Sequence, residues 1–162
     1  MNKNPNAASQ GDPNRNAGFD AIRGLGYVFI LCDDIDKMKR FYQDLFRFRI
    51  EEETPGLMVE FRVGSLFLGL RPRGRHYDGP RAPKQSASVQ LSFRVPPSDV
   101  DIAYETLRAQ NIDVIEPPTN QDWPHRTLYF RDPENNILEV FADIHVQETI
   151  STPSGVHQLV ES

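Results

Sequence analysis

A carboxylate shares a strand face with apolar side chains near the end of the chain. Residues 137–142 read ILEVFA, an apolar run of strand length, and side chains along a strand alternate between two faces. Glu139 is therefore expected on the same face as Ile137 and Phe141. An isolated buried charge is costly, so this carboxylate needs a metal ion, a cation, a ligand or a proton.

The segment before Glu139 predicts the other half of a hairpin. Residues 127–131 are rich in β-branched and aromatic types, and residues 132–136 read DPENN, in which Pro presets φ and Asn tolerates a left-handed backbone. Across such a hairpin, Arg126 or Arg131 could form an ion pair with Glu139. This structural pairing and a ligand-binding role are both open for Glu139.

The remaining elements come in two units of the same order. The first unit is expected to hold a strand at residues 25–32, a helix at 35–45 and strands at 48–53, 57–62 and 65–71. The second is expected to hold a strand at 89–95, a helix from about 99 to 110, a strand at 112–115, a loop at 117–121 and the hairpin.

The two units align as an internal repeat. DIDKMKRFY at residue 34 parallels DVDIAYETL at residue 99, and LFLGLRP at residue 66 parallels NILEVFAD at residue 136. We predict an α+β fold in which two βαβββ modules form a curved mixed sheet around a cleft, with the helices outside. The expected boundaries are a disordered tail at 1–20, the first module at 21–72, a linker at 73–86, the second module at 87–144 and a C-terminal tail at 145–162.

Composition excludes several classes of protein. The 162 residues carry a net charge of −5, which does not favour a nucleic-acid-binding surface. The single cysteine, Cys32, excludes an intrachain disulfide and a multi-cysteine zinc site, and is expected to be inert packing. No signal peptide or membrane-length apolar run is found, so we expect a cytoplasmic protein without a membrane partner.

Three spaced motifs carry a resemblance to a known family. They are DIDKMKRFYQDLF after the first strand, VQLSFRV, and WPHRTLYFRDPENNILEV. Together they resemble the vicinal oxygen chelate superfamily, which includes glyoxalase I, extradiol dioxygenases, fosfomycin resistance enzymes and bleomycin resistance proteins. The resemblance covers residues 25–144, although Pro124-His125 and Asn135 replace glycines of the usual final motif.

The resemblance implies four inward positions that hold a metal ion in metal-using members. Carried over here, they are Tyr27, Gly69, Gln90 and Glu139. This set is poor for a divalent cation, because glycine supplies no side chain and a neutral tyrosine hydroxyl is a weak ligand. The four histidines are expected in loops or the tail: His76, His125, His145 and His157. We therefore prefer no cofactor, with a divalent metal on Gln90 and Glu139 as the alternative.

The resemblance also implies a cleft that binds a small molecule. The expected ligand-binding residues are Tyr27, Gln90, Trp123, His125, Arg126 and Glu139. Three of them have plainer alternatives: rim packing for Trp123, backbone hydrogen bonding for Gln90 and simple solvent exposure for His125.

Three functions follow from these expectations. The preferred one is a metal-independent protein of the bleomycin-resistance type that binds an aromatic or cationic small molecule. The alternative is a metal-dependent lyase, isomerase or dioxygenase resembling glyoxalase I, with Glu139 as the catalytic carboxylate. The third is a regulatory module whose tail docks on a partner. The resemblance further implies a homodimer.

Overall fold

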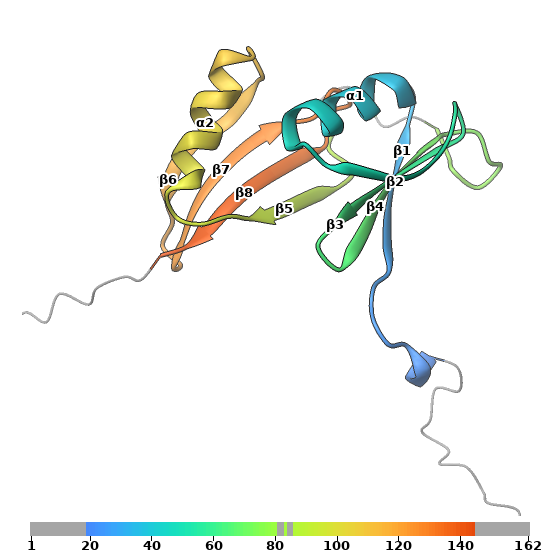
Figure 1. Ribbon diagram of the computed structural model, residues 1–162, viewed down its shortest axis with the longest axis horizontal. Coiled ribbons are helices and arrows are strands. Elements are labelled where there is room, and N and C mark those ends of the chain that lie inside the picture. Colours follow the sequence, from blue (N-terminus) through green and yellow to red (C-terminus); the bar gives the residue numbers. More distant parts are fainter. Residues whose placement is uncertain (1–18, 81–82, 84–85, 145–162) are drawn as a thin grey trace, which may run out of the picture.

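The computed structural model describes residues 19–144 except 81, 82, 84 and 85, and its elements repeat the βαβββ order (Figure 1). The first module comprises β1 (Tyr27–Cys32), α1 (Ile35–Phe46), β2 (Arg49–Thr54), β3 (Met58–Val63) and β4 (Leu66–Pro72). The second comprises β5 (Gln90–Arg94), α2 (Asp99–Ala109), β6 (Val114–Asn120), β7 (His125–Arg131) and β8 (Ile137–Asp143). A short 3₁₀ helix, η1 (Phe19–Ala21), precedes them. The predicted α+β class and two modules are confirmed.

The expected tails fall largely outside this description. Residues 1–18 and 145–162, including His145 and His157, are not among the described residues. Within the described part, no helix has the length and apolar character needed to span a membrane.

The strands form two mixed sheets. Their orders are β1-β4-β3-β2 and β5-β8-β7-β6. The pairs β1–β4 and β5–β8 are parallel, and the other pairs are antiparallel. The single curved sheet expected from the repeat is thus divided, because β1 and β5 are the edge strands of separate four-stranded sheets.

One hydrophobic core joins the two modules. Met38 and Tyr42 lie one helical turn apart on α1 and are completely buried. Phe46, at the end of α1, reaches the second module, where its ring centroid lies 4.8 Å from that of Phe93 and 6.1 Å from that of Phe130. α1 therefore packs against both modules, while α2 lies along the second sheet (Figure 1).

Within residues 19–144 as described, the opposite face of each sheet carries no helix of its own module. Strand alternation and register assign the residues to these faces. The first open face comprises Tyr27, Phe29, Glu60, Arg62, Phe67 and Gly69. The second open face comprises Gln90, Ser92, Arg94, His125, Tyr129, Glu139 and Phe141. Candidate site residues lie on both.

Two sequence predictions near residue 120 were wrong. Residues 117–121 were expected as a loop, yet β6 continues to Asn120. β6 tolerates Pro117 and Pro118 because it is an edge strand, so the N–H that proline lacks is not needed for a hydrogen bond to a second neighbouring strand. The register with β7 is also irregular at these residues. His125, expected in a loop, is the first residue of β7.

Candidate functional site

Three neutral side chains hold Glu139 on the second open face. The residue is 7% exposed. The Ser92 hydroxyl donates to its Oε2, the Tyr129 hydroxyl donates to its Oε1 at 2.9 Å, and Gln90 Nε2 donates to Oε2 at 3.4 Å. Ser92 and Tyr129 lie directly across from Glu139 on the neighbouring strands, so the register of the sheet creates this arrangement. Burial and the nearby carboxylate raise the pKa of Tyr129, which therefore remains a donor.

Neither arginine of the hairpin pairs with Glu139. Arg126 lies on the helix side of β7, where its guanidinium donates to Asp101 of α2 at 2.7 Å. Arg131 Nη1 donates to the carbonyl oxygen of Asn135 at 3.1 Å. The ion-pair explanation for Glu139 is therefore not supported, and Arg126 is not brought to the second open face.

His125 belongs to a polar rim at one end of the second open face. Its Nε2 lies 3.1 Å from Asp143 Oδ1, and Arg94 also pairs with Asp143. The Arg94 guanidinium and the imidazole both lie against the Phe141 ring, at 5.0 Å and 4.9 Å from its centroid. Trp123 precedes β7 in a connection and is 49% exposed.

Tyr27 lies on the other sheet, among aromatic rings. Its ring centroid lies 5.7 Å from that of Phe29 and 4.9 Å from that of Phe67. Gly69 is directly across from Phe29, and a Cβ on Gly69 would lie less than 3.0 Å from three carbons of that ring. The four positions that the resemblance implies for a metal are thus divided between two open faces, with Gly69 covered by a ring.

The side chains present do not fit a catalytic metal centre. Within the described ranges, no group of three or more His, Cys, Asp or Glu residues is placed to hold an ion. Gln90 and Glu139 supply two donors, fewer than the roughly three protein ligands of a catalytic site, and Glu139 is already engaged by hydroxyls. Cys32 is no substitute, because burial raises the pKa of its thiol to about 12.

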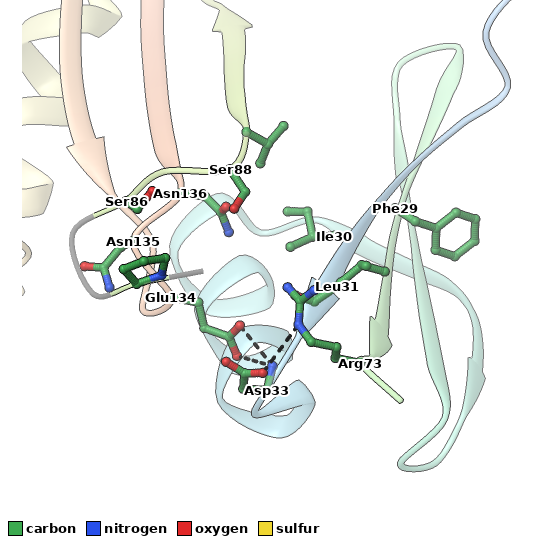
Figure 2. A pocket seen from close by; sticks show the side chains of 12 residues that line it. Phe29, Ile30, Leu31, Asp33, Arg73, Ser86, Ser88, Glu134, Asn135 and Asn136 are labelled. Carbon is green, nitrogen blue, oxygen red and sulfur yellow. Dashed lines mark hydrogen bonds and ion pairs between the residues drawn. The ribbon is translucent and has the colours of Figure 1, made fainter. Parts of the chain in front are cut away.

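A separate cavity of about 340 Å³ lies where the modules meet (Figure 2). Beside it, the Glu134 carboxylate accepts from the backbone N–H of Asp33 at 2.8 Å and of Asp34 at 2.7 Å. Arg73 Nε lies 3.7 Å from Asp33 Oδ1. The residues that line this cavity come from β1, the connection to β5 and the β7–β8 turn. The Ile30 side chain points toward the cavity and the Phe29 ring points away from it (Figure 2). None of the ligand-binding residues expected from the sequence lines it.

Sequence reasoning missed three residues of the open faces. Ser92 and Tyr129 contact Glu139, and Glu60 lies across from Gly69. Strand alternation along VQLSFRV places Ser92 on the same face as Gln90, so the sequence alone could have predicted Ser92 as a residue of this face. Tyr129 and Glu60 required the exact strand register, which a single sequence does not specify.

Comparison with known proteins gives concordant matches. Residues 24–140 match the family model described as Glyoxalase/Bleomycin resistance protein/Dioxygenase superfamily. The chain is 30% identical over 123 residues to the glyoxalase domain-containing protein RDO1 of Mycosarcoma maydis, covering 74% of this chain and 68% of that protein. It is 25% identical over 119 residues to the metallothiol transferase FosB of Staphylococcus saprophyticus, covering 74% and 76%.

Solved structures show the same fold. A glyoxalase/bleomycin resistance protein/dioxygenase from Nocardioides has a TM-score of 0.66 at 20% identity, covering 85% of this chain and 91% of that one. A lactoylglutathione lyase from Agrobacterium tumefaciens has a TM-score of 0.61 at 22% identity, covering 75% and 95%.

Proposed function

The chain belongs to the glyoxalase, bleomycin resistance protein and dioxygenase superfamily, and from this premise we propose that it binds an aromatic or cationic small molecule without a metal ion. The second open face is the proposed site. The observation that carries the proposal is the Glu139 carboxylate, which three neutral donors orient while no cation of the described residues pairs with it.

The chemistry of this face selects the ligand class. Glu139 carries the negative charge, and a ligand ammonium or amidinium would replace the long contact from Gln90 at 3.4 Å. Phe141, whose ring also contacts the Arg94 guanidinium and the His125 imidazole, offers an aromatic surface for a flat group. A few placed polar groups beside apolar surface are typical of small-molecule sites.

Titration with benzamidine, a flat aromatic cation, tests the proposal. We expect amide NMR shifts at residues 90, 92 and 139, no comparable shifts with neutral benzamide, and at least about tenfold weaker binding in Glu139→Gln. Glu105→Gln on the exposed face of α2 removes the same charge elsewhere and should bind normally. Equal affinity in wild type and Glu139→Gln would refute a role for this carboxylate.

A metal-dependent lyase, isomerase or dioxygenase is the second candidate. It is favoured by the relatives named metallothiol transferase and by Gln90 and Glu139 at positions that the resemblance implies for ligands. Calorimetric titration with Mn²⁺, Ni²⁺ and Zn²⁺ separates the candidates. Stoichiometric binding that disappears in Glu139→Gln would favour the metal-dependent function and overturn the first proposal.

The proposal includes a homodimer in the cytoplasm. The two open faces, each bordered by an edge strand, leave Tyr27 46% and Phe29 42% exposed in the single chain. A second copy would shield part of this apolar surface from water. Sedimentation equilibrium tests the assembly, and a monomer at micromolar concentration would count against it. Cell fractionation tests the compartment.

A further inference from the structure

A second carboxylate lies buried on the first open face. Glu60 of β3 is 7% exposed, as Glu139 is. No hydrogen bond or ion pair from the described residues reaches its side chain. Its neighbour on β2 is Glu52, which carries the same charge, so burial and this neighbour together raise the pKa of Glu60.

The strand neighbours of the two carboxylates explain the contrast. Glu139 on β8 has hydroxyl donors on both adjacent strands, Ser92 and Tyr129. Glu60 has Gly69 on one side, which has no side chain, and Glu52 on the other. An unpartnered buried carboxylate destabilises the folded chain, so its presence calls for a partner from outside.

A cation on the same strand face is engaged elsewhere. Arg62 follows Glu60 by two residues on β3 and donates from Nη2 to Glu51 at 3.0 Å and from Nε at 3.1 Å. Its guanidinium lies over the Phe67 ring, 4.5 Å from the centroid. Arg62 therefore shows that this face holds a cation against an aromatic ring, and it leaves Glu60 unneutralised.

Aromatic rings cover the surface next to Glu60. Tyr27 stacks against both Phe29 and Phe67, and Phe29 extends over Gly69, the residue directly across from Glu60. Aromatic ring faces attract cations, and the attraction strengthens when water is excluded.

We propose that the first open face binds an organic cation, with Glu60 as its anionic partner and the rings of Tyr27 and Phe29 as its platform. The chemical class is an ammonium or amidinium attached to an apolar group, because the carboxylate requires a charge and the rings require apolar contact. This site is on the first sheet and does not rest on the function proposed for Glu139.

Binding is tested with 2-phenylethylammonium on the full chain. We expect amide NMR shifts at residues 60, 67 and 69, weak or absent shifts with neutral 2-phenylethanol, and at least about tenfold weaker binding in Glu60→Gln. Glu139→Gln should retain these shifts, so failure at one face is distinguished from failure at the other. Absence of shifts at these residues, or equal binding of the neutral alcohol, would overturn the proposal.

Thermal unfolding without ligand gives a second readout. Glu60→Gln removes an unpartnered charge, so its Tm should rise by roughly 2–4 °C. The Glu139 carboxylate accepts hydrogen bonds from two hydroxyl groups. An amide in its place accepts these bonds less well, so the Tm of Glu139→Gln should fall. A lower Tm in Glu60→Gln would assign Glu60 a structural role and contradict the proposal.

Discussion

The ring of Phe29 lies over Gly69, in the space that a side chain at residue 69 would enter. A Cβ there would lie less than 3.0 Å from three ring carbons. Phe29 and Gly69 are directly paired between β1 and β4, so the ring crosses only one interstrand spacing. A position that the resemblance implies for a metal ligand is thus part of an aromatic surface in this protein.

Gly69→Ala should displace this ring and lower the free energy of unfolding by about 1 kcal/mol. The cost stays modest because Phe29 is 42% exposed and can rotate toward solvent. Urea denaturation measures the stability, and aromatic NMR shifts of Phe29 report the displacement. Gly26→Ala is the matched control, since a Cβ there meets no atom within 4 Å. Equal effects of the two substitutions would contradict the prediction.

Tyr42→Phe should remove a buried hydrogen bond between the modules. The Tyr42 hydroxyl donates to Asp132 Oδ2 at 2.9 Å, and the two residues are 0% and 4% exposed. We expect the free energy of unfolding to fall by about 1–3 kcal/mol, because the Asp132 carboxylate loses a donor without gaining water. Tyr104→Phe on α2, whose hydroxyl has no partner among the described residues, is the control for chemical denaturation. A loss no larger than that of the control would show that this bond contributes little.

Glu134→Ala should weaken the attachment of α1 to the second module. The Glu134 carboxylate accepts from the backbone N–H groups of Asp33 and Asp34, which immediately precede α1. A negative charge is favourable at a helix N-terminus, so we expect a loss of about 1–2 kcal/mol. Hydrogen exchange at the amides of residues 33 and 34 should accelerate. Glu105→Ala provides a control on an exposed helix surface, and unchanged exchange in Glu134→Ala would argue against the attachment.

Asp78 should make stability depend on acid pH. Arg71 donates to both of its carboxylate oxygens, at 2.9 Å and 2.7 Å, and the N–H groups of Gly74 and Arg75 donate as well. These donors hold the pKa of Asp78 well below its usual 3.8. Because the folded-state pKa is the lower one, the stabilisation is fully present above the unfolded pKa and declines as pH falls below it. Asp78→Asn should therefore be less stable than wild type at pH 7, with the difference shrinking below about pH 4. Urea denaturation across this range checks the prediction, and a constant difference would contradict it.

Local patterns predicted most elements because their causes are local. The apolar spacing of α1 corresponds to the face that the structure buries, and the alternation of β8 places Glu139 with Ile137 and Phe141 as expected, although the core face of β8 is the opposite one. The expected loop at 117–121 failed because proline disfavours a central strand but not an edge strand. Whether a strand lies at the edge depends on the order of strands in the sheet, and the residues of one strand do not reveal that order.

The sequence by itself determined the two modules, their internal repeat and the face on which Glu139 lies, because helix and strand periodicities act over a few residues. Only the tertiary structure decided which side chains meet across strands. Ser92 and Tyr129 reach Glu139, Phe29 covers Gly69, and no described residue donates to Glu60. These outcomes depend on register between strands that are far apart in the chain, where a slip of one residue turns every side chain to the other face.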